Sequence, residues 1–130
     1  MDAVHNILKI EDMKPGSHLC SIYETEQQHR DLLTPFIRFG LERDEKVIYI
    51  TDFRSSKTVF DYLRDDGLEV EPYLKNGQLV ILTSNETYMR QGIFDPESMI
   101  ALLRIETERA LDEGHSALRV TGEMLSLIHI

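Results

Sequence analysis

The sequence predicts an α/β domain in which helices cover both faces of a mainly parallel sheet, giving three layers in the order α-β-α. Two observations support this prediction. Short apolar runs rich in Ile, Val and Tyr lack strict alternation, which indicates strands that are covered on both faces. Segments of helical period separate these runs, and such alternation is typical of parallel sheets joined by crossovers. At 130 residues, the chain is long enough for one domain with a substantial core.

Four segments are expected to form the strands of this sheet. They are residues 18–23 (HLCSIY), 46–51 (KVIYIT), 78–83 (QLVILT) and 117–121 (ALRVT). The fourth segment resembles the others but carries a charged residue, Arg119. With helices between them, the predicted order is β-α-β-α-β-α-β.

The first helix is expected over residues 26–43, where apolar residues recur at helical spacing. They are Leu32, Leu33, Phe36, Ile37 and Leu41. Pro35 lies within this run and predicts a kink or a division of the helix, because proline has no N–H to donate and its ring clashes with the preceding turn.

The second helix is expected to start at an N-cap formed by Ser55 or Ser56 and to end at Gly67. Its inward residues are predicted to be Val59, Phe60 and Leu63. The segment EPYLKNG, residues 71–77, is then predicted to be a short turn that leads into the third strand.

The third helix is expected to start at Asp95-Pro96, a capping acid followed by proline at the first helical position. Its apolar residues at helical spacing are Ile100, Leu103, Ala110 and Leu111, and Gly114 ends it. We expect residues 1–12 to form an N-terminal arm and residues 13–130 to form the domain. Because little chain follows the fourth strand, we expect the domain to be truncated at its C-terminus.

The composition restricts the classes of function. The chain has 14 basic and 23 acidic residues, a net charge of −9, and this charge disfavours direct binding to nucleic acid. The single cysteine, Cys20, excludes an internal disulfide and any zinc site made of several cysteines. The sequence has no apolar run of about 20 residues and no secretory signal, so we expect a cytoplasmic location and no membrane segment. We expect no cofactor.

A ligand of an open α/β sheet binds beyond the carboxyl ends of the strands, where the connections diverge. This rule selects polar residues after all four predicted strands. They are Tyr23, Glu24 and Thr25 after the first, Thr51, Asp52 and Arg54 after the second, Thr83, Ser84, Asn85 and Tyr88 after the third, and Thr121 and Glu123 after the fourth. The alternative is that strand ends are polar simply because they meet water.

No phosphate-binding motif is present in the first predicted strand-to-helix turn. The sequence contains neither G-x-x-x-x-G-K-[ST] nor G-x-G-x-x-G. Instead, Glu24 and Glu26 follow the strand, and their charges would repel a triphosphate. ATP hydrolysis through a standard phosphate loop is therefore not expected.

His18 and Cys20 are two residues apart on the first predicted strand, so their side chains point to the same face. A nucleophile with its base, or two metal ligands, would use such a pair. A catalytic pair usually needs a third orienting group, and a closed metal site needs about four ligands; the sequence offers no obvious completion for either. The alternative is a buried cysteine beside a hydrogen-bonded histidine.

Several blocks of the sequence together resemble the MEDS domain, the sensory domain named for methanogen and methylotroph proteins and the dichloromethane-responsive regulator. These blocks are PGSHLCSIYET, FIRFGLERDEKVIYITD, LKNGQLVILTSNETYMRQGIFDPESMIALL and RVTGEM. The H-x-C-x-x-Y element is carried by His18, Cys20 and Tyr23. The family tends to have tryptophan soon after G-E-M, and here Leu125 and Ser126 follow instead.

The resemblance implies a fold like the RecA/KaiC ATPase core without its phosphate loop. It also implies a signal-input module that senses small molecules such as hydrocarbon derivatives. Such modules accompany histidine-kinase, anti-sigma or DNA-binding output modules.

The leading hypothesis is therefore a non-catalytic domain that senses a small molecule and signals to an output module. The ligand would lie near His18, Cys20, Tyr23, Glu24, Asp52, Tyr88 and Glu123. One alternative is a module for protein interaction, including a homodimer. A second alternative is a divergent nucleotide-binding enzyme or a cysteine-dependent hydrolase.

Overall fold

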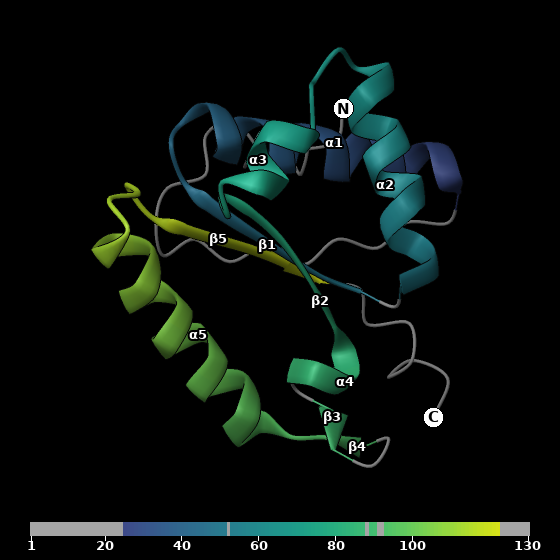
Figure 1. Cartoon of the computed structure of the whole chain (residues 1–130). Helices are drawn as coiled ribbons and strands as arrows, with labels where there is room; N and C mark the ends of the chain where they lie inside the picture. The colour runs from purple at the N-terminus through teal and green to yellow at the C-terminus, as the bar shows by residue number, and fades with distance from the viewer. Residues whose placement is uncertain (1–24, 52, 88, 91–92, 123–130) are drawn as a thin grey trace, which may run out of the picture.

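Among the residues that the structure describes, the centre of the protein is a sheet of three parallel strands (Figure 1). The computed structural model describes residues 25–51, 53–87, 89–90 and 93–122. The strands are β1 (Lys46–Thr51), β2 (Leu79–Thr83) and β5 (Leu118–Gly122), and their order in the sheet is β2-β1-β5. β1 is therefore the central strand, and it pairs in parallel with both neighbours.

Helices cover both faces of the sheet and form the outer layers (Figure 1). One face carries α1 (Glu26–Glu42), α2 (Phe53–Asp65) and α3 (Glu71–Lys75), and α5 (Pro96–Asp112) covers the other face. The short helix α4 (Ser84–Thr87) and a small hairpin, β3 (Met89–Arg90) with β4 (Ile93–Phe94), connect β2 to α5. The predicted α/β class with helices on both faces of a parallel sheet is confirmed.

The alternation of side chains along β1 divides the core into two clusters. Val47 and Tyr49 pack on the face of α1 and α2, whereas Ile48 and Ile50 pack on the face of α5. All six residues of β1 are buried. A strand covered on both faces needs apolar residues at successive positions, which explains the uninterrupted apolar run in the sequence.

Three of the four predicted strands are confirmed. The prediction for 46–51 matches β1, the prediction for 78–83 matches β2 with a start one residue earlier, and the prediction for 117–121 matches β5 shifted by one residue. The strand predicted at 18–23 and the arm predicted at 1–12 lie outside the described residues.

The first helix is continuous over Glu26–Glu42, so of the two outcomes predicted at Pro35, a kink or a division, the division does not occur. α1 begins with a capping box, in which the Thr25 hydroxyl accepts from the Gln28 N–H and the Gln28 side chain accepts from the Thr25 N–H. Pro35 removes one hydrogen bond from the helix interior. Leu33 and Ile37, on either side of the proline, are both buried in the core, and this packing holds the helix together.

The second helix starts at Phe53, so the predicted caps at Ser55 or Ser56 are wrong. Only one residue separates β1 from α2, and both serines therefore fall within the first helical turn. The predicted end at Gly67 is confirmed. Gly67 has a φ of +89° and donates to the Arg64 carbonyl, a C-terminal capping arrangement that glycine adopts without steric penalty.

The inward face of α2 agrees with the prediction. Val59 and Leu63 are fully buried in the core, and Phe60 is half-buried against it. The segment that follows differs from the prediction, because EPYLKNG contains the helical turn α3 instead of only a turn. Pro72 lies in the first turn of α3, where its missing N–H has no helical partner to lose.

The predicted start of α5 at Asp95-Pro96 is confirmed, and the helix ends at Asp112, before Gly114. The Asp95 carboxylate does not cap the helix through its side chain but accepts a hydrogen bond from the Ser98 hydroxyl at 2.6 Å.

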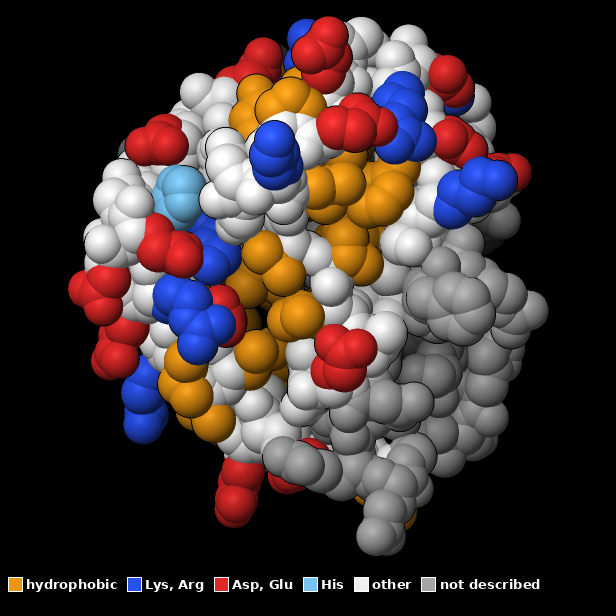
Figure 2. Space-filling model, in the orientation of Figure 1, with side chains coloured by type: hydrophobic (Ala, Val, Ile, Leu, Met, Phe, Trp, Pro, Cys, Tyr) orange, Lys and Arg blue, Asp and Glu red, His pale blue; other side chains and the backbone are white. Residues whose placement is uncertain are grey.

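The apolar face predicted for α5 is partly wrong. Met99 and Leu102 pack against the sheet and Ala110 is buried, but Ile100 and Leu111 are exposed over 56% and 54% of their surface. Figure 2 shows hydrophobic side chains at the surface in the region of α5, among acidic and basic side chains. α5 therefore has apolar residues on more sides than the sheet covers.

Candidate functional site

The carboxyl edge of the sheet is the candidate site. All three strands are parallel, so their last residues lie at the same end of the molecule, near α4 and the start of α2 (Figure 1). Thr51 ends β1, Thr83 ends β2, and Thr121 is the penultimate residue of β5. Thr51 and Thr83 are direct neighbours in the register of the sheet. The Thr51 side chain is fully buried, and those of Thr83 and Thr121 are half-buried.

The connections that leave β1 and β2 go to opposite faces of the sheet. From Thr51 the chain continues into α2 on one face, and from Thr83 it continues through α4 toward α5 on the other (Figure 1). Where the connections of neighbouring parallel strands diverge in this way, a crevice opens at the carboxyl ends. The topology therefore places the candidate site between the ends of β1 and β2.

Thr83, the last residue of β2, directs the chain into α4. Its hydroxyl accepts from the Glu86 N–H at 3.2 Å, and its carbonyl accepts from the Thr87 hydroxyl at 3.1 Å. The first contact is an N-cap, which satisfies one of the free N–H groups at the start of a helix. Thr83 thus fixes the direction in which α4 leaves the sheet.

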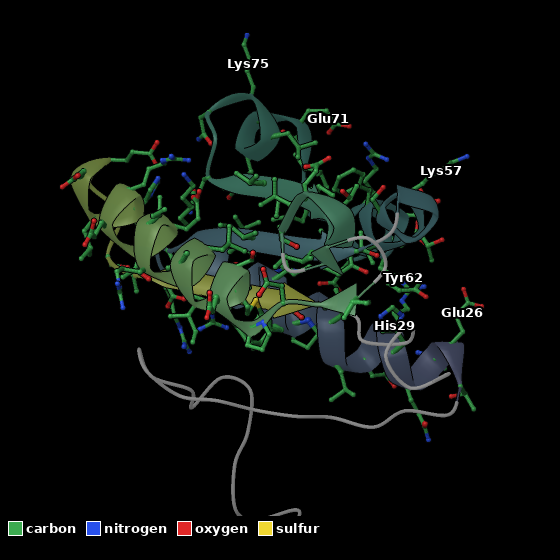
Figure 3. The ribbon with its side chains drawn as sticks, turned by 90° about the horizontal axis from the view of Figure 1, so that it is seen from below. Glu26, His29, Lys57, Tyr62, Glu71 and Lys75 are labelled. Carbon is green, nitrogen blue, oxygen red and sulfur yellow. The ribbon has the colours of Figure 1, made fainter. Side chains whose placement is uncertain are left out.

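A second group of side chains gathers at the start of α1, around Tyr62 of α2 (Figure 3). The Tyr62 hydroxyl donates to the Glu26 carboxylate at 3.3 Å, and the His29 ring meets the Tyr62 ring edge-on at 5.9 Å between centroids. The Arg30 guanidinium lies 5.5 Å from the centre of the same ring. Because these contacts join residues more than thirty positions apart, sequence periodicity gave no signal for them.

The Tyr62 group lies at the start of α1, close in sequence to the predicted ligand residues Tyr23 and Glu24. α1 begins directly after Thr25, and Tyr23 and Glu24 precede Thr25 in the sequence. The group supplies an aromatic ring, a carboxylate and an imidazole next to that point. The Arg30 guanidinium covers the same ring, so the group carries charges of both signs around a tyrosine that is itself buried.

None of the seven predicted ligand-binding residues can be placed. His18, Cys20, Tyr23, Glu24, Asp52, Tyr88 and Glu123 all lie outside the described residues. Their chain neighbours Thr51, Thr87 and Gly122 are described; Thr51 and Gly122 end their strands, and Thr87 ends α4. The assignment of the seven residues to a ligand therefore stays a prediction.

The described residues offer no metal centre. Among residues 25–51, 53–87, 89–90 and 93–122, no three His, Cys, Asp or Glu side chains come together as a metal site would require. In the same part of the chain, no helix has the length and apolar character needed to cross a bilayer.

Residues 17–129 match the MEDS family, described as the methanogen/methylotroph, DcmR sensory domain. The chain belongs to this family. The match covers most of the chain and includes every described residue of the sheet and of its helices. No curated protein and no solved structure matches the chain. The resemblance inferred from the H-x-C-x-x-Y element and the later blocks is thus confirmed at the level of the family.

Membership of the MEDS family makes the chain a sensory domain, the input part of signalling proteins. The family description concerns sensing and suggests a role without catalysis. A sensory input domain implies association with an output module of a signalling protein.

Proposed function

We propose that this MEDS domain binds a small organic molecule at the carboxyl edge of its sheet and does not transform it chemically. The observation that carries the proposal is the divergence of the chain after Thr51 and Thr83, two residues that are neighbours in the sheet. Crevices of this kind are the usual ligand sites of open α/β sheets.

The chemistry of this edge favours a small ligand with little negative charge. Threonines end β1 and β2, and the residues before them, Ile50 and Leu82, are apolar. The net charge of −9 disfavours phosphates and other anions. A hydrocarbon derivative with one polar group, such as an alcohol or a halogenated alkane, fits these properties.

The segment from α4 to β4 is the part of the fold best suited to report the ligand. This segment follows Thr83, which is the N-cap of α4, and it leads directly into α5. A ligand that contacts the end of β2 would favour one arrangement of α4 and so shift the population of this segment. We infer that a histidine-kinase, anti-sigma or DNA-binding output module detects this shift.

Isothermal titration and thermal unfolding of the chain test the proposal, with a panel of short alcohols, halogenated alkanes and nucleotides. A ligand at about 100 times its Kd should raise Tm by roughly 5–10 °C. Tyr23→Phe, Glu24→Gln and Thr121→Val should each weaken binding by about tenfold, since each removes one polar group that we propose to meet the ligand. Ser116→Ala is the control, because Ser116 binds the Arg43 carbonyl at the opposite edge of the sheet.

Three results would count against the proposal. Absence of binding across the panel would favour a module for protein interaction alone. Binding that Ser116→Ala weakens as much as Thr121→Val does would place the ligand elsewhere. Turnover of a bound nucleotide, or selective alkylation of Cys20 near neutral pH, would favour an enzyme.

A further inference from the structure

The outer surface of α5 carries a row of exposed residues whose spacing suits packing against the same row on a second copy of the helix. Ile100, Arg104, Thr107 and Leu111 follow one another at spacings of four, three and four residues. This is the spacing of a helix–helix seam, because such residues fall on one stripe of the helix. The row spans three turns, roughly 16 Å along the axis. All four side chains are exposed.

The two residues at the ends of this row are apolar, and Thr107 between them can be covered by a neighbouring side chain. Ile100 and Leu111 are exposed over 56% and 54% of their surface. Between them, the Thr107 hydroxyl donates to the Leu103 carbonyl at 2.6 Å, so its hydrogen-bonding need is met within the helix. Thr107 can therefore be covered by an apolar neighbour at little cost.

The charges beside the row are complementary to each other in an antiparallel arrangement. Arg104 and Glu108 are exposed and four residues apart, yet among the described residues neither has an ion-pair partner. If a second α5 packs antiparallel so that Ile100 meets Leu111, Arg104 of each copy comes opposite Thr107 and Glu108 of the other. The two-fold symmetry then repeats each apolar contact and each ion pair.

We propose that two copies of this chain associate through α5, packed antiparallel about a two-fold axis, with Ile100 against Leu111 and Arg104 against Glu108 of the second copy. A second copy is the occupant that the charge pattern selects, since Arg104 and Glu108 on one helix supply both members of each ion pair. A single helix seam buries less than a standard interface, so the dimer is weak and forms at high concentration. The proposal is independent of any ligand at the carboxyl edge.

Sedimentation velocity of the chain from ~10 µM to ~1 mM measures the monomer–dimer equilibrium, a range chosen for a small interface. Leu111→Gln and Ile100→Gln should each raise the dimer Kd by roughly tenfold or more. Ile105→Gln is the matched control, since Ile105 is 52% exposed on the same helix but lies about 140° around it from Ile100. It should change Kd by less than about twofold.

Charge exchange tests the antiparallel register. Arg104→Glu alone and Glu108→Arg alone place like charges opposite each other and should weaken the dimer by about tenfold. The double variant Arg104→Glu/Glu108→Arg restores opposite charges and should recover the original Kd within about twofold. Circular dichroism and urea unfolding confirm that each exposed substitution leaves the fold intact.

A disulfide experiment tests the register independently. In a Cys20→Ser background, Ile100→Cys mixed with Leu111→Cys should give mainly the mixed disulfide, because these positions meet across the two-fold axis. A chain that stays monomeric over the whole range contradicts the proposal, as does equal weakening by Ile105→Gln. Disulfides mainly between identical variants, or a double charge variant that stays weak, would also overturn it.

Discussion

Arg119 of β5 and Glu45, the residue before β1, form an ion pair that is almost completely buried. Nε of Arg119 lies 2.7 Å from Oε1 of Glu45, and the two side chains are 6% and 9% exposed. The guanidinium also donates to the Phe36 carbonyl at 3.0 Å and lies 4.8 Å from the centre of the Phe36 ring. An arginine fits within a buried strand here because its charge is paired and its N–H groups have acceptors.

Removing only one partner of the Arg119–Glu45 ion pair should destabilise the fold strongly. Glu45→Ala leaves the Arg119 guanidinium buried without its counter-charge, so we expect a loss of about 3–5 kcal/mol in the free energy of unfolding, measured in urea. Glu71→Ala is the control, because its pair with Arg64 is exposed on both sides and water and salt screen it, so its loss should be much smaller. Similar losses in the two variants would contradict the structural role of the Arg119–Glu45 pair.

Gly40 should tolerate no side chain, although it lies within a helix. A Cβ at this position would be 2.7 Å from Cδ of Arg119 and 2.8 Å from Cγ2 of Val47, and the ion pair holds the arginine in place. Alanine improves helix propensity by about 1 kcal/mol, but overpacking costs about 1–3 kcal/mol. We therefore expect Gly40→Ala to lower the urea midpoint.

Gly122→Ala provides the comparison for Gly40→Ala. A Cβ at Gly122 would meet atoms of Ile50 at 3.5 and 3.6 Å, which are ordinary contacts. This variant should change the free energy of unfolding by less than about 0.5 kcal/mol. A Gly40→Ala variant as stable as Gly122→Ala would show that Arg119 can move away.

The stability of the fold should fall in acid partly through Glu113. The hydrogen bond from the Lys46 ammonium, at 2.7 Å, lowers the pKa of the Glu113 carboxyl below its ordinary value of 4.5. A lowered pKa in the folded state means that the contribution is fully present above about pH 4.5 and is lost as the pH falls through the lowered value. Glu113→Gln should therefore be less stable than the original chain near pH 7, with a difference that shrinks below pH ~4.

A double variant isolates this effect from other acidic groups. In a Lys46→Met background, Glu113→Gln should change the pH dependence of unfolding much less, because Lys46 is the main group that lowers the pKa of Glu113 and His115 and Arg109 contribute less. Urea unfolding at several pH values measures it. A pH-dependent difference that persists in the Lys46→Met background would assign the effect to another partner.

Thr34 should be replaceable by valine with a gain in stability. Its hydroxyl oxygen is buried, and among the described residues it has no hydrogen-bond partner. Valine has nearly the same shape and removes the cost of burying that hydroxyl, so we expect Thr34→Val to raise the free energy of unfolding by about 1 kcal/mol. A loss on this substitution would indicate that the hydroxyl does have a partner in solution.

The elements with strong local signals were predictable from the sequence. The run KVIYIT predicted β1, and Asp95-Pro96 predicted the start of α5, because apolar periodicity and capping residues act over short distances. The start of α2 was predicted wrongly, since the end of β1 sets it and the serines do not. The hairpin of β3 and β4 was not predicted, because strands of two residues carry no periodicity.

The candidate site, too, was predictable from the sequence only in part. The rule that ligands bind at the carboxyl ends of the strands named this edge from the sequence alone, and the ligand site there stays a prediction. The family match shows that the chain is a sensory domain. The neighbouring position of Thr51 and Thr83 and the contact of Tyr62 with Glu26 depend on which strands and helices become neighbours.

The sequence by itself determined the α/β class, the family, and three of the strands with the helices between them. Only the tertiary structure decided the strand order β2-β1-β5, the burial of Arg119 against Glu45, and the exposure of Ile100 and Leu111 on α5. The physical reason is that local patterns fix how each segment folds, whereas partners far apart in the chain are chosen by how the faces of those segments pack together.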